Sequence, residues 1–161
     1  MGIKDCKNCR ECCKFEKDEI YFAPLFTKGE IERLKNKASF KPYKNSDEIF
    51  QIELIKSGPI YVCPYLDNRE HICKIYENRP FDCRIWPFIF MKDKKGNLVL
   101  ACFHKGMCRV VGNMSDKEFE GYREETMGWL EKSKMVDYIR MHKELAWDYE
   151  ADTFIIKEIV Y

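Results

Sequence analysis

The stretch Cys6-Lys-Asn-Cys9-Arg-Glu-Cys12-Cys13 places four thiols within eight residues. Thiolates three residues apart converge on one inorganic centre, because a loop of this spacing wraps around a metal ion or an iron–sulfur cube. Adjacent side chains diverge on both helices and strands, so Cys12 and Cys13 are not expected to face one metal ion together. One of them then joins Cys6 and Cys9, and the other serves a second centre or a structural role.

Five further cysteines follow this cluster, and they are Cys63, Cys73, Cys83, Cys102 and Cys108. Nine is an odd number, so a framework made only of disulfides leaves one thiol over. Cys12 and Cys13 are also not expected to form a disulfide with each other, because the Cα atoms of adjacent residues lie ~3.8 Å apart, below the usual disulfide range of about 4.4–6.8 Å. The cysteines are therefore interpreted as reduced metal ligands, and eight of them suffice for two four-ligand sites.

Length and composition predict a single folded domain over residues 1–161, with residues 146–161 as a docking tail. The 161 residues are 45% hydrophobic, and their charges nearly cancel to a formal +1. Such a balance gives no specific nucleic-acid signal. No membrane segment is expected, because no run approaches ~18 apolar residues, and no secretory signal is seen. A cytoplasmic location follows as the expectation.

Local patterns predict a small α+β fold around a loop-rich, cysteine-ligated metal core. Thr27-Lys-Gly-Glu30 matches a capping box and begins a short helix that includes Ile31, Leu34 and Ala38. Pro80 should begin a short helix or tight turn. Alternating apolar residues and turn signals predict strands over residues 49–55 and 60–66 and a hairpin of residues 87–92 and 98–102.

A second capping box, Ser115-x-x-Glu118, predicts an amphipathic helical segment that runs to about Leu145 and breaks near Ser133. Its apolar residues are expected in the core, and they are Phe119, Tyr122, Met127, Trp129, Leu130, Met135, Tyr138, Ile139 and Met141. The tail from Phe154 to Val160 is expected to form an edge strand or a docking segment.

Several function classes are disfavoured by the sequence. The glycines form no nucleotide-binding loop. A radical S-adenosylmethionine motif, C-x3-C-x2-C, begins at Cys9 and Cys13 but has Glu16 at its third position. The chain is also short for a full barrel of ~200 residues or more. With three histidines, a mainly histidine-ligated zinc site is not expected.

The cysteine spacing and its neighbours carry a family resemblance. The N-terminal cluster, Cys63-Pro-Tyr-Leu66 and Cys73-x-Ile-Tyr-x-x-Arg-Pro-x-x-Cys83-Arg-x-x-Pro87 resemble the YkgJ-type cysteine-cluster family, a zinc- or iron-chelating domain. That family includes the flagellin lysine N-methylase FliB. The resemblance implies that the metal ligands are Cys6, Cys9, Cys12, Cys13, Cys63, Cys73, Cys83 and Cys102. Cys108 does not clearly match the pattern and is the predicted spare thiol.

Residues around Cys83 are candidates for supporting the centre. Arg79 and Arg84 flank this cysteine and are expected to offset the negative charge of a cluster or to bond nearby carbonyl groups. Tyr76 is expected in an apolar shell that limits access of water and so tunes a redox potential. Ordinary surface and core roles explain the same residues equally well.

Three functions stay open on the sequence. The first is a redox or cluster-dependent protein with one or two iron–sulfur clusters, of the [4Fe-4S] type, and an unknown redox or protein partner. The second is a zinc-stabilised structural or interaction domain. The third is a protein-modifying enzyme, or its accessory protein, by analogy with the lysine methylases, which are longer than this chain and carry sequence that it lacks.

Overall fold

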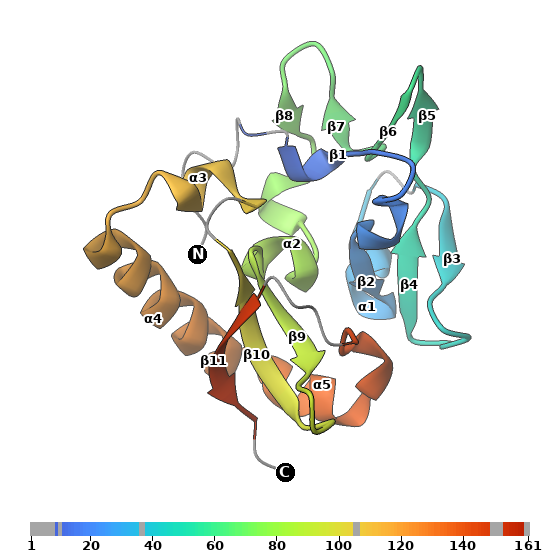
Figure 1. Cartoon of the computed structure of the whole chain (residues 1–161). Helices are drawn as coiled ribbons and strands as arrows, with labels where there is room; N and C mark the ends of the chain where they lie inside the picture. Colours follow the sequence, from blue (N-terminus) through green and yellow to red (C-terminus); the bar gives the residue numbers. More distant parts are fainter. Residues whose placement is uncertain (1–8, 10, 36–37, 105–106, 149–152, 160–161) are drawn as a thin grey trace. The chain divides into compact units, whose positions relative to one another are not determined.

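The computed structural model describes residues 9, 11–35, 38–104, 107–148 and 153–159. The chain divides into two compact units, Gly2–Arg84 and Ile85–Tyr161, called here the N-terminal and C-terminal units. Both combine helices with short antiparallel sheets, so the predicted α+β class is confirmed (Figure 1). Within the described residues, no helix has the length and apolar character needed to cross a bilayer.

One sheet of the N-terminal unit has the strand order β2-β4-β3, with β2 at Leu25–Thr27, β4 at Ile49–Ile52 and β3 at Phe40–Pro42. The short helix α1 (Lys28–Glu32) follows β2 directly, and both halves of the predicted capping box between Thr27 and Glu30 are present. Apolar side chains from these elements and from the turns next to them form a core cluster whose buried members are Ala23, Phe26, Leu34, Ile52 and Tyr65.

A second sheet in the same unit has the order β1-β6-β5, with β1 at Lys14–Phe15, β6 at Ile60–Val62 and β5 at Ile55–Ser57. Strands β7 (Leu66–Asp67) and β8 (Ile72–Cys73) form a small hairpin. The remaining elements are the 3-10 turns η2 (Glu11–Cys13), η3 (Ile20–Phe22) and η4 (Tyr76–Asn78) and the helix α2 (Phe81–Ile85), which begins directly after Pro80 as predicted.

Two predicted strands are interrupted in the structure. The expected strand over residues 49–55 divides into β4 and β5, which belong to different sheets. The expected strand over residues 60–66 ends at Val62, because Cys63 precedes Pro64 and proline has no N–H to donate to a sheet. This interruption places Cys63 in a turn, where its side chain is not committed to a face of a sheet.

The C-terminal unit contains the predicted hairpin, with β9 at Phe88–Lys92 and β10 at Leu98–Phe103. Strand β11 (Thr153–Glu158) pairs antiparallel with β10, giving the order β11-β10-β9. The predicted tail therefore forms an edge strand. The helices are α3 (Arg109–Gly112), α4 (Asp116–Lys132) and α5 (Met135–Met141), followed by the turn η6 (Lys143–Leu145).

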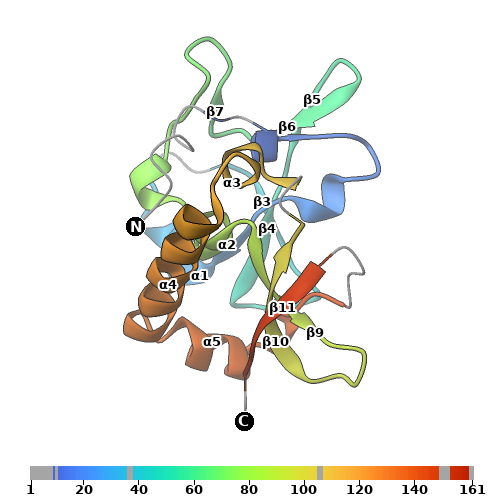
Figure 2. The same cartoon turned by 60° about the vertical axis from the view of Figure 1, so that its left-hand side comes forward.

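Helices α4 and α5 lie against one side of this sheet (Figure 2). The capping box of Ser115 and Glu118 begins α4, and the predicted break falls at Ser133 and Lys134, whose φ of 55° is left-handed. Phe119, Tyr122, Leu130 and Ile139 are buried as predicted. Met141 is not in the core, because the last turn of α5 leaves its side chain 72% exposed.

Candidate metal centre

Pairing of β1 with β6 brings Cys13 beside Cys63. Lys14 lies opposite Val62 in this pair, and the Cys63 N–H donates to the Cys13 carbonyl oxygen at 2.9 Å. A segment that holds Cys12 and Cys13 is thereby fixed to one 50 residues later in the chain. The two vicinal cysteines then differ in environment, since the Cys13 backbone takes part in this contact while the Cys12 thiol lies near Cys83.

The Cys63 sulfur sits in a turn that supplies backbone donors. The N–H groups of Tyr65 and Leu66 hydrogen bond to it and favour a thiolate, whereas burial and the nearby Cys73 thiol disfavour one. Burial dominates and raises the pKa of Cys63 to about 11. Cys73 is positioned by the β7–β8 hairpin, where it lies opposite Leu66, and by the Lys74 N–H, which donates to the Tyr65 carbonyl at 2.8 Å.

Cys83 lies on α2 and has three other thiols as electrostatic neighbours. Burial raises the pKa of Cys83 well above its usual value, and the negative forms of Asp82, Cys12, Cys63 and Cys73 raise it further. Repulsion of this kind requires the groups to lie close together. Thiols from four separate segments, η2, the turn after β6, β8 and α2, therefore gather in the N-terminal unit.

Two carboxylates hold α2 against the β2–α1 segment. Glu30 Oε1 accepts a hydrogen bond from the Phe81 N–H at 2.8 Å, and Asp82 Oδ2 accepts one from the Leu25 N–H at 3.0 Å. Burial raises the pKa of both carboxyl groups, to about 7 for Asp82, while these backbone donors oppose the rise. We call this reciprocal pair the carboxylate clamp. It satisfies a free N–H at the start of α2 and fixes the helix that carries Cys83.

The three residues expected to support the centre form one small network. The Arg79 guanidinium lies 4.1 Å from the centroid of the Tyr76 ring, and Arg79 is buried. Arg84 donates from Nε to the Arg79 carbonyl at 2.9 Å and from Nη2 to the Glu77 carbonyl at 2.8 Å. Of the two roles expected for Arg84, the structure therefore shows bonding to carbonyl groups.

Replacing Arg84 with methionine is expected to lower the free energy of unfolding by about 1–2 kcal/mol, because two carbonyl bonds are lost while the apolar stem remains. Arg84→Lys should restore little of this loss, since one ammonium cannot reproduce the guanidinium fork. Denaturant titration measures both values. Arg69→Met, at the exposed tip of the β7–β8 hairpin, is the matched control. An Arg84→Met protein as stable as the control contradicts the expected role.

Cys102 and Cys108 lie near each other in the C-terminal unit, and both are buried. Burial, with the Cys108 thiol as a second cause, raises the pKa of Cys102 to about 12. The Cys102 Sγ also donates to the Phe103 carbonyl at 3.2 Å. The assignment of Cys102 as a ligand and of Cys108 as the spare thiol stays a prediction.

The remaining predicted ligands are Cys6, Cys9 and Cys13. Cys6 lies outside the described residues, and Cys9 and Cys13 are half-buried in the N-terminal unit. In the described part of the chain, no three Cys, His, Asp or Glu side chains already stand in a ligand arrangement for a metal ion. The donor set nevertheless fits a metal that prefers sulfur, because four thiols are neighbours and all four belong to partly exposed residues.

Sequence reasoning missed Glu30 and Asp82 as positioning residues. The local signals were present, since Glu30 closes a capping box and Asp82 is an acidic residue in the first turn of α2. Their long-range bonds span 51 and 57 residues, and no periodic pattern encodes such a contact.

Comparison with known proteins assigns the family. No curated protein and no solved structure matches the chain. Residues 5–125 match the CxxCxxCC family model, described as a "Putative zinc- or iron-chelating domain". This range holds every one of the nine cysteines and covers most of the chain, and the family is the one that the cysteine spacing resembles. The chain therefore belongs to the CxxCxxCC family of zinc- or iron-chelating domains.

Proposed function

We propose that the N-terminal unit holds a metal centre through Cys12, Cys63, Cys73 and Cys83, and that this centre is an iron–sulfur cluster of the [4Fe-4S] type. The observation that carries the proposal is the gathering of three thiols from distant segments around Cys83. Cysteine thiolates are the usual ligands of such clusters, and four of them complete one site. When bound, a cluster of this type supplies one-electron chemistry or a redox signal.

The surroundings of the thiols support this assignment. Burial raises the pKa of the Cys63 and Cys83 thiols, so both hold their protons until a metal cation binds. The metal then displaces these protons and offsets the negative charge of the thiolates. The N–H groups that point at the Cys63 sulfur stabilise its thiolate form, and hydrogen bonds to sulfur are one of the terms that set a cluster's potential. Phe81 and Tyr65, each two residues from a proposed ligand, are buried and add apolar surroundings to the site.

The number of thiolates is the same for both candidates, because a [4Fe-4S] cluster and a tetrahedral zinc ion each take four. Cys9 and Cys13 are further partly exposed thiols in the same unit. Zinc is the second candidate, because the set of Cys12, Cys63, Cys73 and Cys83 has the composition of a closed structural zinc site. In that case the centre serves folding, and function lies on another surface.

Anaerobic purification followed by elemental analysis and a visible spectrum separates these outcomes. A brown protein with iron and acid-labile sulfide in equal amounts supports the cluster. A colourless protein with stoichiometric zinc contradicts the cluster and supports the structural site. Protein that carries neither metal, and that takes up neither during anaerobic reconstitution, contradicts metal binding by these residues.

A further inference from the structure

Cys13 and Cys63 lie opposite each other at the end of the pair formed by β1 and β6. Lys14 lies opposite Val62 in this antiparallel pair, so the next pair in the same register is Cys13 with Cys63. The hydrogen bond from the Cys63 N–H to the Cys13 carbonyl oxygen, at 2.9 Å, extends the register to the two cysteines. Residues paired in this way have Cα atoms about 5.5 Å apart, within the disulfide range of about 4.4–6.8 Å.

A disulfide between these two cysteines is expected to be strained and easily reduced. Opposite residues of antiparallel strands have Cβ atoms about 4.5–5.5 Å apart, whereas a relaxed disulfide needs about 3.5–4.5 Å. The two segments must therefore approach each other by about 1 Å. Strand β1 can yield in this way because it has only two residues. Strained disulfides are the labile ones, and a reversible switch needs a bond of this kind.

The two cysteines differ in their relation to the proposed metal centre. Cys13 is half-buried, and within the described residues its thiol makes no hydrogen bond. Cys63 is one of the four thiols that gather around Cys83, and backbone N–H groups point at its sulfur. A bond between Cys13 and Cys63 therefore joins a thiol outside the ligand set to one inside it, and it leaves the centre with three ligands.

We propose that Cys13 is a thiol–disulfide exchange site that accepts a low-molecular-weight disulfide, such as glutathione disulfide, and passes the oxidation to Cys63. This inference rests on the metal centre proposed above, because its consequence is the loss of a ligand. Oxidation then releases the metal, and reduction restores the site.

The exchange takes two steps, each of which makes one S–S bond and breaks another. The Cys13 thiolate attacks a sulfur of glutathione disulfide, so a mixed disulfide forms and one glutathione thiolate leaves. The Cys63 thiolate then attacks the Cys13 sulfur, so the protein disulfide forms and the second glutathione thiolate leaves. The two cysteines lose two electrons and glutathione disulfide gains them. Each leaving thiolate takes up a proton from the solvent.

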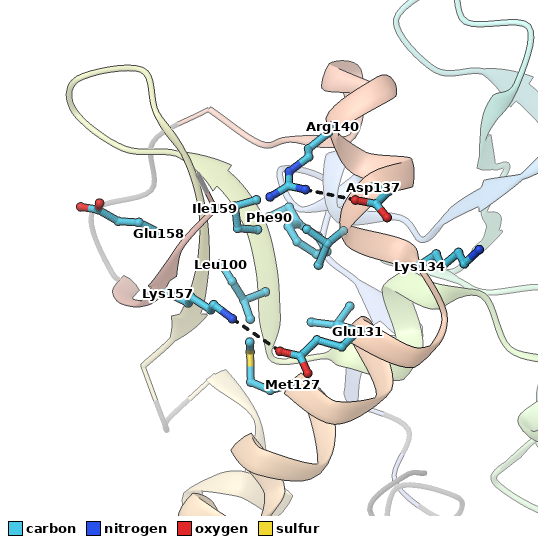
Figure 3. Close-up of a pocket in the computed structure, with 12 residues that line it drawn as sticks. Phe90, Leu100, Met127, Glu131, Lys134, Asp137, Arg140, Lys157, Glu158 and Ile159 are labelled. Carbon is cyan, nitrogen blue, oxygen red and sulfur yellow. Dashed lines mark hydrogen bonds and ion pairs between the residues drawn. The ribbon is translucent and has the colours of Figure 1, made fainter. Parts of the chain in front are cut away.

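The thiols of the C-terminal unit are not expected to take part. Cys102 and Cys108 are only 0% and 8% exposed. A pocket of about 400 Å³ lies in this unit between α4, α5 and the strands of the sheet (Figure 3). The described residues that line it include apolar side chains and the Arg140–Asp137 ion pair but no cysteine. A disulfide that enters this pocket from solvent therefore meets no thiol.

Peptide mapping tests the proposal on the full chain, purified anaerobically and incubated with glutathione disulfide. Free thiols are alkylated before digestion with trypsin, which places Cys13 in residues 11–14, Cys63 in residues 57–69 and Cys73 in residues 70–74. We expect a cross-link between residues 11–14 and 57–69 that dithiothreitol reverses. Metal should pass to a chelator as the cross-link forms.

Two serine variants assign the cross-link. Cys13→Ser should keep its metal as purified, form no cross-link and lose metal to the chelator at least about tenfold more slowly in glutathione disulfide. Cys9→Ser is the matched control, because Cys9 is also a half-buried thiol outside the four proposed ligands. This variant should form the cross-link and release metal as the unmodified chain does.

Several outcomes overturn the proposal. They are the absence of a cross-link, a cross-link from residues 57–69 to 70–74 instead, a Cys13→Ser protein that still joins residues 11–14 to 57–69, and a Cys13→Ser protein purified without metal. A cross-link through Cys13 in a chain that binds no metal supports the exchange and contradicts the metal centre, so the two proposals fail on different observations.

Discussion

Replacing Cys83 with alanine is expected to remove the metal from the protein and to destabilise it. Cys83 is the thiol around which Cys12, Cys63 and Cys73 gather, so its loss opens the proposed ligand set. Metal content should fall at least about tenfold, and the free energy of unfolding should fall by several kcal/mol, because metal binding is linked to folding. Elemental analysis and denaturant unfolding of the anaerobically purified protein measure both. The ligands predicted from the sequence also include Cys9, so a Cys9→Ala protein that keeps its metal limits the centre to Cys12, Cys63, Cys73 and Cys83.

Cys108→Ala is the control for this prediction. Its thiol is buried in the C-terminal unit and is the predicted spare, so this variant should keep its metal and lose only about 1 kcal/mol from the deleted sulfur. Cys102→Ala distinguishes a ligand from a core thiol, since only a ligand lowers the metal content. A stable Cys9→Ala, Cys83→Ala double variant with full metal content contradicts the ligand assignment.

Replacing Glu30 with alanine is expected to cost about 3 kcal/mol of stability and to weaken metal binding roughly tenfold or more. Glu30 accepts hydrogen bonds from the Thr27 N–H at 2.9 Å, the Thr27 hydroxyl at 3.1 Å and the Phe81 N–H at 2.8 Å. Its removal leaves the N–H at the start of α2 without this acceptor and releases one half of the carboxylate clamp. Denaturant unfolding and competition with a metal chelator measure the two effects.

Glu118→Ala provides a matched comparison because Glu118 closes the other capping box of the chain. Glu118 accepts only from Ser115 and has no bond to a distant helix among those that the structure gives for it. Its loss should destabilise the protein less than the loss of Glu30 and leave metal affinity unchanged. Equal effects of the two substitutions show that Glu30 acts only as a local cap and contradict the role of the clamp.

The fold was predictable where a short motif determines local structure. The two capping boxes, the hairpin around Asp93–Asn97 and the break near Ser133 follow from side chains within a few residues of each other. Strands β1 and β6 were not predictable as partners, because two or three residues are too few for a periodic pattern. Their pairing depends on tertiary contacts, and it is this pairing that brings Cys13 to Cys63.

The sequence predicts that cysteines form the candidate site, but it does not predict which of them come together. The spacing of the cysteines predicts thiol ligands, and the family match supports a zinc- or iron-chelating domain. Which thiols meet depends on how β8 and α2 are held, and the clamp residues Glu30 and Asp82 act across more than 50 residues of chain. Thiolate ligation also leaves zinc and iron–sulfur centres alike in sequence, because both use tetrahedral sulfur donors.

X-ray absorption at the metal edge of the anaerobically purified protein most directly tests the proposed metal centre, in which thiolates from separate segments bind one cluster. The account predicts an iron edge with a shell of sulfur atoms at about 2.3 Å, the usual length of a metal–thiolate bond, and a further shell of iron neighbours from the cluster. A zinc edge with four sulfur neighbours supports the four thiolate ligands but contradicts the iron–sulfur cluster. A first shell made of nitrogen and oxygen, for either metal, contradicts the account.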